Sequence, residues 1–383
     1  MKILAIDTSC DETSIAVVEK DRVLSNVLSS QIQAHREWGG VVPSLAKRKH
    51  EEMFDLVLKI ALKRAKVKID EIDTFAVTKG PGLAVALEVG IKKAKELALK
   101  YNKPLIPVNH MEGHLYSALA KNSKGNPEVE YNFPVLVLLI SGGHTEFVLM
   151  LNHGQYELLG KTLDDALGES FDKVGRMMDM GYPAGPVLER IAERGDENRF
   201  ELPIPMQNSG NANMSYSGLK TAAMKLINDM IKSPMNVYAQ KFANSLQVKS
   251  SILNSQSFDL STRQSSNSQL IADISASFQK AAVEQVLLKT KYLLEKLEQE
   301  KLKINDLIIA GGVSQNKYLR KKIRTSFGKK LRIHYPTGKK LYTDNAGMIG
   351  VAAYYNAIRG NTLTDTHAIN TLDRDPNWQI NEI

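Results

Sequence analysis

The histidines at positions 110 and 114 have the residue type and the spacing to hold a metal ion. They lie in the segment NHMEGH (109–114), which follows an apolar run and begins with Asn109, a good helix cap. Residues at i and i+4 share one face of a helix, so both imidazoles would point the same way. Two imidazoles placed like this suit a divalent metal.

Asp344 is a candidate third ligand. It stands at the start of a helix predicted over 346–356, in the part of the second half that corresponds to the histidine segment of the first half. Two lobes facing each other would bring these two helix starts together. A His, His and Asp set with open positions suits Fe(II) or Zn(II), and the sequence leaves both metals open.

A zinc protease is the competing interpretation of the histidine pair. In the H-E-x-x-H pattern of such enzymes, a glutamate directly follows the first histidine. Here Met111 occupies that position, and Glu112 lies about 200° around the helix from His110. Glu112 would therefore point away from the metal, which argues against proteolysis.

Two glycine-containing turns are candidate phosphate or nucleotide sites. One is Ser141-Gly142-Gly143-His144-Thr145 between two predicted strands, and the other is Gly311-Gly312 between a strand and a helix. Glycine lets backbone N–H groups approach an anion, although a tight hairpin turn also explains the first pattern. Asn316 would contact a nucleoside or cap the helix. The G-x-x-x-x-G-K-[ST] loop is absent, which excludes a P-loop NTPase.

An internal repeat organises the chain. Residues 3–18 (ILAIDTSCDETSIAVV) align without gaps with residues 135–150 (VLVLLISGGHTEFVLM), and each copy predicts strand, turn and strand. The turn of the first copy is acidic, with Asp7, Asp11 and Glu12 where the second copy has Leu, Gly and His. We expect this acidic turn to face the cleft as a catalytic or cation-binding turn, although turn-forming Asp and Ser are the alternative.

Each copy continues with a strand, a glycine loop, a Lys-rich helix and another strand. This alternation predicts an α/β fold with a largely parallel sheet in each lobe. We predict lobes at 1–130 and 131–360, with a helical insertion at about 160–275. The Ser-rich segment 249–268 within it favours a solvated, mobile insertion. The polar tail 361–383 is expected to be a surface extension.

The composition is that of a globular protein with a substantial core. The chain has 383 residues, of which 43% are hydrophobic and 24% charged. No stretch approaches the ~20 apolar residues of a spanning helix. The lone Cys10 fits a reducing cytosol, and the N-terminus resembles a strand more than a signal peptide. We therefore expect a cytoplasmic protein with no membrane partner.

A basic stretch near the C-terminus is a candidate surface for a nucleic-acid backbone. The formal net charge is +8, and no acidic residue lies between Asp306 and Asp344. A solvated helix face is the alternative to phosphate contact. The basic residues of the stretch are Lys317, Arg320, Lys321, Lys322, Arg324, Lys329, Lys330, Arg332, Lys339 and Lys340.

From about residue 1 to residue 355, the motifs together resemble the TsaD family. Its members are bacterial tRNA N6-adenosine threonylcarbamoyltransferases, formerly described as O-sialoglycoprotein endopeptidases. The matching segments, in order, are Asp7–Thr13, Gly40–Pro43, Gly80–Leu83, His110–His114, Ser141–Thr145, Phe171–Lys173, Ser217–Thr221, Ala310–Ser314 with Asn316, and Thr343–Asn345.

The resemblance implies a duplicated, two-lobed actin-like ATPase fold, as in sugar kinases and heat-shock chaperones, with a nucleotide cleft between the lobes. It implies transfer of a threonylcarbamoyl group from threonylcarbamoyl-adenylate to N6 of the adenosine next to the tRNA anticodon. It further implies a TsaB-like paralogous subunit and a TsaE-like ATPase as partners.

The resemblance also assigns site residues. His110, His114 and Asp344 would hold the metal, with Fe(II) the first choice and Zn(II) the alternative. Asp11 and Glu12 are candidates to relay the amine proton. The residues that would line the substrate pocket are Leu139, Ile140, Ser141, Gly142, Gly143, Asp172, Gly185, Glu189 and Asn316.

Two departures from the family pattern bear on the pocket. Ala184 stands where many members have glycine, and Glu189 stands where they have aspartate. The extra methylene moves the Glu189 carboxylate by about 1.5 Å, which puts its expected ribose contact in question. Two other functions fit the same fold: an ATPase or phosphotransferase, and a non-catalytic scaffold subunit. The histidine pair argues against both.

Overall fold

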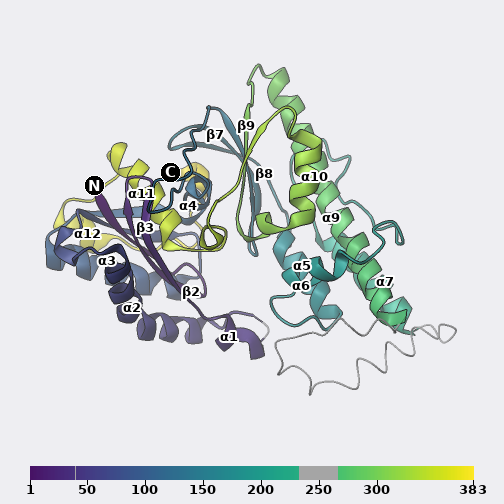
Figure 1. Cartoon of the computed structure of the whole chain (residues 1–383), viewed down its shortest axis with the longest axis horizontal. Coiled ribbons are helices and arrows are strands. Elements are labelled where there is room, and N and C mark those ends of the chain that lie inside the picture. Colours follow the sequence, from purple (N-terminus) through teal and green to yellow (C-terminus); the bar gives the residue numbers. More distant parts are fainter. Residues whose placement is uncertain (39, 233–265) are drawn as a thin grey trace.

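The computed structural model describes residues 1–38, 40–232 and 266–383 (Figure 1). Within them the chain forms two five-stranded sheets flanked by helices, which confirms the predicted two-lobed α/β fold. Most of the Ser-rich segment 249–268 lies outside the described residues. Its last three residues begin helix α9 (Ser266–Gln299). The lobe boundaries at 130 and 360 stay predictions.

The first sheet has the strand order β3-β2-β1-β4-β5. Strands β1, β2 and β3 pair antiparallel, whereas β4 and β5 run parallel to β1. The prediction of a largely parallel sheet is therefore wrong for half of each sheet, because a short turn can only return the chain antiparallel. The strands are β1 (Lys2–Asp7), β2 (Glu12–Glu19), β3 (Arg22–Ser30), β4 (Thr74–Gly80) and β5 (Leu105–Asn109).

The second sheet repeats this topology in the order β10-β9-β6-β7-β8. The repeat extends to register, since Ile3 pairs with Val18 and the equivalent Val135 pairs with Met150. The ungapped alignment of the two copies is thus confirmed. The strands are β6 (Val135–Ile140), β7 (Thr145–Asn152), β8 (Gln155–Lys161), β9 (Asp306–Ala310) and β10 (Arg332–His334).

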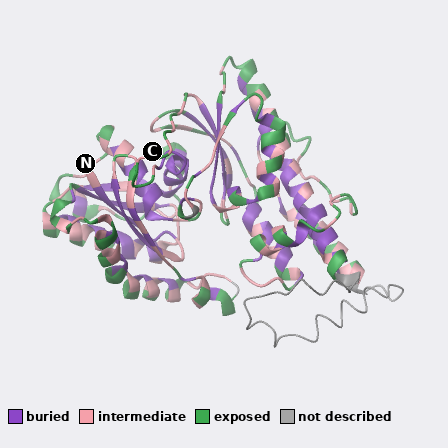
Figure 2. Cartoon of the chain, in the orientation of Figure 1, coloured by how far each residue is buried: buried purple, intermediate pink, exposed green. Residues whose placement is uncertain are grey.

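The helices form layers outside and between the sheets. Helices α2 (Pro43–Ala65) and α3 (Ala84–Tyr101) cover the outer face of the first sheet, where Leu4 and Ile6 are fully buried. Helices α5 (Leu167–Met177), α7 (Ser217–Lys232), α9 and α10 (Lys317–Phe327) cover the outer face of the second sheet. Figure 2 shows buried strands and helices that expose one side.

Two short helices fill the space between the sheets. Helix α4 (His110–Tyr116) follows β5 and packs partly on β6 and β9 of the second sheet, while α11 (Ala346–Ile358) packs on the first sheet. Both helices belong to one core that includes residues of both sheets, such as Ile3 and Val135. The central core therefore fixes the two lobes around α4 and α11, which carry the predicted metal ligands at their ends.

The tail after Gly360, expected to be a surface extension, instead packs on the body of the protein. Leu363 exchanges backbone hydrogen bonds with Leu105 of β5, and Ile369 and Ile380 are buried. No helix in the described part of the chain is long and apolar enough to span a bilayer. The remaining helices are α1 (Ile32–His35), η1 (Arg36–Trp38), η2 (Ile69–Glu71), α6 (Gly185–Ala192), η3 (Gly312–Gln315), η4 (Lys339–Leu341), α12 (Thr366–Thr371) and η5 (Ile380–Glu382).

Candidate active site

The two histidines lie on α4 directly after β5. The side-chain oxygen of Asn109 accepts hydrogen bonds from the backbone N–H groups of Met111 (2.8 Å) and Glu112 (3.3 Å). This confirms the predicted cap and fixes where the helix begins. With the start fixed, the i, i+4 spacing puts the imidazoles of His110 and His114 side by side, with ring centroids 4.9 Å apart.

Asp344 lies just before α11 and is held by a second cap. The side-chain oxygen of Asn345 accepts from the Met348 N–H (3.1 Å) and from the Asn26 amide on β3 (2.9 Å). The Ala346 N–H donates to the hydroxyl of Ser14 on β2 (2.9 Å). The start of α11 is therefore tied to the first sheet, which carries Asp344 toward α4.

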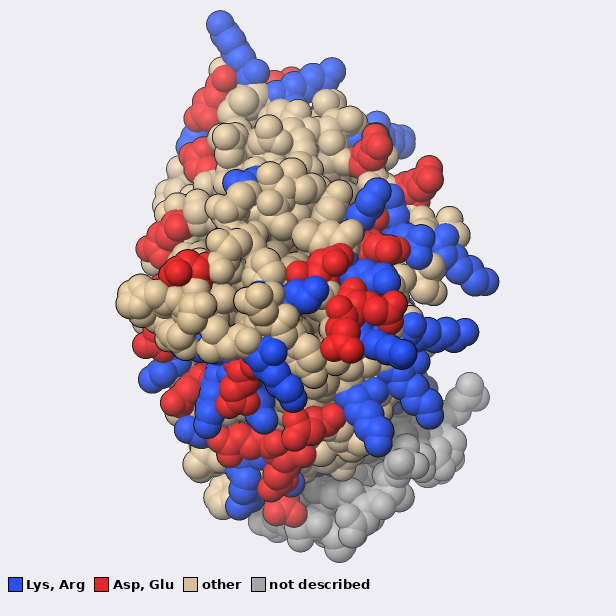
Figure 3. All heavy atoms as spheres, turned by 90° about the vertical axis from the view of Figure 1, so that its left-hand side faces the viewer, with Lys and Arg blue, Asp and Glu red and all other residues tan. Residues whose placement is uncertain are grey.

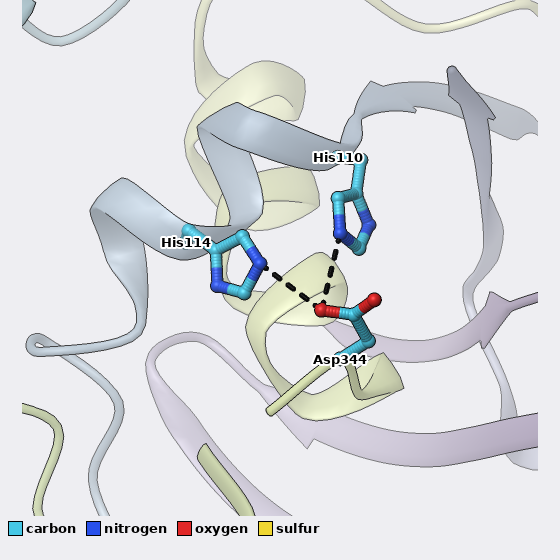
Figure 4. A group of neighbouring side chains, drawn as sticks. All are labelled: His110, His114 and Asp344. Atoms are coloured by element: carbon cyan, nitrogen blue, oxygen red, sulfur yellow. Dashed lines mark ion pairs between the residues drawn. The ribbon is translucent and has the colours of Figure 1, made fainter. Parts of the chain in front are cut away.

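The structure brings the three predicted metal ligands together (Figure 4). The Nε2 atoms of His110 and His114 lie 3.4 Å and 3.2 Å from Oδ1 of Asp344. The possible ligand atoms of the three residues all lie within 4.8 Å of one another. The two histidine side chains are 6% and 1% exposed, whereas that of Asp344 is 26% exposed, which leaves an open side for substrate.

Close packing of α4 on α11 sets this geometry. A Cβ at Gly113 would lie 2.8 Å from Ile349 Cδ1 and 3.2 Å from Met348 Cγ, so a larger residue there would require these α11 side chains to shift. Glu112 points away from the ligands, as predicted, and supplies no base to the metal. Its carboxylate accepts from the Tyr156 hydroxyl (2.7 Å), the Asn356 amide (2.6 Å) and the Arg359 guanidinium (3.0 Å).

The donor set fits a divalent cation. Two imidazole nitrogens and one carboxylate oxygen turn toward one point, and such N and O ligands suit Fe(II) or Zn(II). Burial by itself would raise the pKa of Asp344, but the two histidines outweigh it and hold the pKa well below its usual range. Among the described residues, none forms a hydrogen bond with the buried Nδ1 atoms of His110 and His114. Asp7 Oδ1 lies 3.7 Å from the Nδ1 of His110, which is where a supporting carboxylate would orient a ligand imidazole.

The acidic turn between β1 and β2 lies beside these ligands. Burial raises the pKa of Glu12 well above its ordinary value, and the nearby Asp11 and Asp344 add to the effect. The turn is anchored from behind by His50 of α2, whose ring nitrogens contact the Thr13 hydroxyl (2.8 Å) and the Cys10 carbonyl (3.0 Å). A desolvated carboxyl in a fixed turn is suited to proton transfer.

The equivalent turn between β6 and β7, the predicted anion cradle, has internal hydrogen bonds of its own. The Ser141 hydroxyl accepts from the N–H groups of Gly143 (3.3 Å) and His144 (3.0 Å). These two donors are therefore used within the turn and do not face an anion in this structure. An added Cβ at Gly142 or Gly143 would meet nothing within 4 Å, so the turn does present open space.

The other predicted pocket residues fall into two groups. The side chains of Leu139 and Ile140 are fully buried in cores on opposite faces of the second sheet, which leaves only their backbone to meet a ligand. Asp172 on α5 accepts hydrogen bonds from the N–H groups of Ala184 (2.8 Å) and Gly185 (2.7 Å). Asp172 thus holds the start of α6 rather than leaving Gly185 free.

Glu189 lines a cavity of about 300 Å³ between α6, α9 and α10. Its carboxylate accepts from the Lys317 N–H (2.7 Å) at the first residue of α10. Asn316 caps that helix by accepting from the Leu319 N–H, and its amide donates to Gln279, which also lines the cavity. Of the two predictions for Asn316, the structure confirms the cap.

Two further residues near the ligands were not predicted as site residues. The pKa of His144 is lowered to about 4 by burial and by the neighbouring His110 and His114, so its imidazole is neutral. Burial, with Asp11 and Asp172 nearby, raises the pKa of Tyr182 to about 12. His144 belongs to the turn Ser141–Thr145 and Tyr182 to the loop before α6, and nothing in their spacing indicated that they would approach the other lobe.

The basic stretch 317–340 is only partly available to a partner. Lys317 and Lys322 form ion pairs with Glu193 and Glu197, each at 3.2 Å. The Arg320 guanidinium lies over the rings of two tyrosines at 4.5 Å and 4.9 Å. Five exposed side chains of the stretch have no ion pair within the described residues: Lys321, Arg324, Lys329, Lys330 and Lys340.

Close relatives share the full length of this chain. A tRNA N6-adenosine threonylcarbamoyltransferase of Thermosipho africanus is 40% identical over 381 residues, covering 99% of this chain and 100% of that protein. The protein of the same description from Clostridioides difficile is 39% identical over 382 residues, covering 99% and 98%. That from Thermomicrobium roseum is 43% identical over 364 residues, covering 94% and 93%.

Solved structures of HypF show the same fold at low identity. HypF from T. kodakarensis superposes with a TM-score of 0.51 at 12% identity, over 94% of this chain and 48% of that one. Full-length HypF in its phosphate- and nucleotide-bound form also gives 0.51, at 13% identity, over 93% and 46%. The two-lobed structure is thus the duplicated actin-like ATPase fold.

The family model described as TsaD, tRNA N6-adenosine threonylcarbamoyltransferase, matches residues 22–351. This family is one of metalloenzymes, and the group formed by His110, His114 and Asp344 could bind a metal. No finding favours an ATPase or a scaffold subunit instead. The chain belongs to the TsaD family, acyltransferases that transfer a threonylcarbamoyl group to N6 of an adenosine beside the tRNA anticodon.

Proposed function

We propose that His110, His114 and Asp344 bind one divalent metal, Fe(II) first and Zn(II) second, and that the threonylcarbamoyl-adenylate lies beside it. The observation that carries this proposal is the convergence of two buried Nε2 atoms on one carboxylate oxygen, at 3.4 Å and 3.2 Å. When bound, such an ion supplies Lewis-acid stabilisation of negative charge on a substrate oxygen. Residues of the protein carry out all other parts of the proposed mechanism.

The reaction requires orientation and removal of one proton, but no protein nucleophile. The adenylate is a mixed anhydride, so the amine nitrogen of the tRNA adenosine attacks the carbamoyl carbon directly. The N6–C bond forms, the C–O bond to the phosphate breaks, and AMP departs with the electron pair. Holding both reactants in this geometry accounts for much of the rate gain.

Glu12 is the proposed acceptor of the amine proton. Its pKa is raised by burial first and by Asp11 second, which makes its carboxylate a stronger base than an exposed glutamate. His50 holds the turn from behind, with contacts of 2.8 Å and 3.0 Å to residues on either side of the carboxyls. Asp11 then serves to tune Glu12.

The nucleotide part of the adenylate is proposed to enter between the β6–β7 turn and the helices of the second lobe. Gly142 and Gly143, which follow Ser141 in this turn, offer open space beside their backbone, and Glu189 lines the cavity of about 300 Å³. Asn316 and Gly185 support the walls of this region through their hydrogen bonds to Gln279 and Asp172.

The tRNA backbone is proposed to contact the exposed basic side chains of the stretch 317–340. Exposed Lys and Arg side chains without an internal partner can release counterions on meeting phosphate. The first lobe is less suited to this role. On the face in Figure 3, charges of both signs are interspersed, and ion pairs such as Lys47–Glu88 (3.2 Å) and Lys49–Glu52 (2.7 Å) occupy α2.

A TsaB-like paralogous subunit and a TsaE-like ATPase are proposed as partners, in the cytoplasm, on the family resemblance. The side chain of Trp38 in η1 is 69% exposed, which is unusual for tryptophan and suits a surface that a partner covers.

Reconstitution tests the whole proposal. Purified chain, loaded with Fe(II), would be combined with the two proposed partners, an adenylate-forming enzyme, labelled threonine and unmodified tRNA. We expect label in tRNA as N6-threonylcarbamoyladenosine, dependent on this chain. Transfer that proceeds equally without bound metal would contradict the metal's role, and transfer without this chain would contradict the assignment of the reaction to it.

A further inference from the structure

The last residues of the chain run between the metal helix and the acidic turn. Residues 375–380 follow α12 and pass across the end of β4, where the Asp375 N–H donates to the Lys79 carbonyl (2.9 Å). The Gly82 N–H donates to the Pro376 carbonyl (3.1 Å), and the amide of Asn109 donates to the Trp378 carbonyl (3.1 Å). We call residues 375–380 the C-terminal strap.

The fit between the strap and β4 leaves no free space. A Cβ built on Gly80 would lie 1.7 Å from the Asp375 carbonyl oxygen and 2.7 Å from its carbonyl carbon, both backbone atoms. Any side chain at position 80 therefore has to displace the strap. The Lys79 ammonium lies over the Trp378 ring at 4.6 Å, and Ile380 is buried in the central core. These contacts seat the strap at both ends.

One end of the strap reaches the metal helix through a single side chain. The oxygen of Asn109 caps α4, while the nitrogen of the same amide donates to Trp378. An amide that bonds on both sides has its orientation fixed, so the cap is held in place by the strap. His110 is the first residue of α4, directly after this cap.

The strap also reaches the acidic turn, through the loop that follows β4. The loop after β4 lies against the start of the β1–β2 turn, since the Leu83 N–H donates to the Ser9 carbonyl (2.7 Å) and a Cβ on Gly82 would lie 2.5 Å from the same oxygen. Ser9 lies two residues before Asp11. The strap therefore contacts, through one layer of residues, both parts of the site that belong to the first lobe.

We propose that the C-terminal strap is a positioning segment, which holds the Asn109 cap so that His110 and His114 face Asp344. Residues 375–380 lie beyond the part of the chain matched by the family model, which ends at residue 351. This inference rests on the proposed metal site. The strap is proposed to act through Asn109 and not by touching the substrate.

The test uses Gly80→Ala in the full chain, with Gly338→Ala as matched control. At Gly338 an added Cβ meets only Leu341 side-chain atoms at 3.4 Å and 3.6 Å, an ordinary contact. Each variant would be titrated with Co(II) alone, and the visible absorption of the bound ion reports its coordination geometry. We expect Gly80→Ala to bind Co(II) about 10-fold more weakly or worse, with an altered spectrum, since losing support for a ligand costs this much.

Trp378→Ala is the second variant, because it loosens the strap from a half-buried surface position without a backbone clash. It should shift Co(II) affinity and spectrum in the same direction by less. Hydrogen exchange should become faster at the capped amides of Met111 and Glu112 in both variants. If Gly80→Ala does not fold, the Trp378→Ala result decides.

The outcomes separate the two proposals. Wild-type protein that fails to bind Co(II) would contradict the metal site itself. If the wild type binds Co(II), and folded Gly80→Ala and Trp378→Ala keep the same affinity and spectrum, the proposed role of the strap is wrong. The metal site would then still stand. Weaker binding in both variants with an unchanged Gly338→Ala supports the strap.

Discussion

The turn between β1 and β2 and the turn between β6 and β7 occupy equivalent places in the two lobes but present different surroundings. Asp7 pairs with Ser14 in the first sheet where Leu139 pairs with Glu146 in the second, so the register is the same. The first turn is enclosed, by His50 of α2 and by the loop at Leu83. The second turn is open around its two glycines.

This difference shows that the duplicated fold places two turns at equivalent sites, while the residues packed around each turn determine its chemistry. Enclosure leaves the Glu12 side chain only partly exposed and raises its pKa, which suits proton transfer. Openness at Gly142 and Gly143 leaves room for a ligand to approach the backbone. On the proposed mechanism, the first lobe supplies the acid–base turn, the second lobe receives the nucleotide, and both lobes contribute ligands to the metal site.

His110→Ala should have the largest effect, because it takes away a proposed ligand of the metal ion itself. Removing one of three ligands should abolish stoichiometric Fe or Zn binding and reduce transfer to background. Metal content per chain and label transfer to tRNA measure this. His367→Ala, at an exposed histidine of α12, is the control and should keep both. Full metal content in His110→Ala would show that the ligand set is wrong.

Glu12→Gln should reduce the transfer rate by about 100-fold or more, in line with loss of a general base. It should also raise the melting temperature at neutral pH. The pKa of Glu12 is higher in the folded than in the unfolded state, so ionisation destabilises the fold as pH rises above the ordinary value of 4.5. Glutamine removes that cost, and the gain should shrink as pH falls below 4.5.

His144→Gln is the matched change, at the equivalent position of the second turn. Because its imidazole is neutral at neutral pH, with a pKa lowered to about 4, this change should produce a smaller loss of rate, and any gain in stability should appear only as pH falls below the ordinary histidine value of 6.5. Rate profiles and thermal melts at several pH values compare the two variants. Equal losses from both would remove the distinction between the enclosed and the open turn.

Gly142→Ala should affect substrate binding more than folding. Nothing lies within 4 Å of an added Cβ, so the melting temperature should stay near that of the wild type. If the adenylate approaches this backbone, the methyl group displaces it, and KM for the adenylate should rise by about 10-fold. Gly338→Ala is the control for a glycine outside the pocket. An unchanged KM would mean that the nucleotide lies elsewhere.

The sequence predicted those parts of the fold and site that depend on local pattern. Buried strand runs fixed the shared register, and the i, i+4 histidines with a capped helix start predicted the metal group, because both follow from short-range geometry. The antiparallel half of each sheet was missed, although the short turns that force it were visible. The anion cradle at Ser141–Thr145 stays a prediction, and the sequence did not reveal that the Ser141 hydroxyl accepts from two of the turn's N–H groups.

Other features depend on contacts between residues far apart in the chain, which no local pattern reveals. Lys317 and Lys322 looked available for phosphate, yet their partners Glu193 and Glu197 come from a distant segment. The tail looked like a polar extension, since only the fold shows that Ile380 enters the central core. The approach of His144 and Tyr182 to the first lobe has the same origin.

The double change Lys329→Ala/Lys330→Ala should give the smallest effect on chemistry and sharpen the contrast between the lobes' surfaces. Both side chains are exposed, line an open hollow of about 440 Å³ and have no ion pair in the described part of the chain. If they meet tRNA phosphates, affinity should fall and the slope of log K against log[salt] should decrease by about 1 for each lost contact. The rate at saturating tRNA should not change, because neither residue touches the site.

Lys49→Ala, at a residue already paired with Glu52, is the control on the first lobe and should leave the slope unchanged. If the salt slope responds to Lys49→Ala and not to the double change, the tRNA contacts the first lobe. The lobe proposed to bind the nucleotide would then not be the lobe that binds the tRNA.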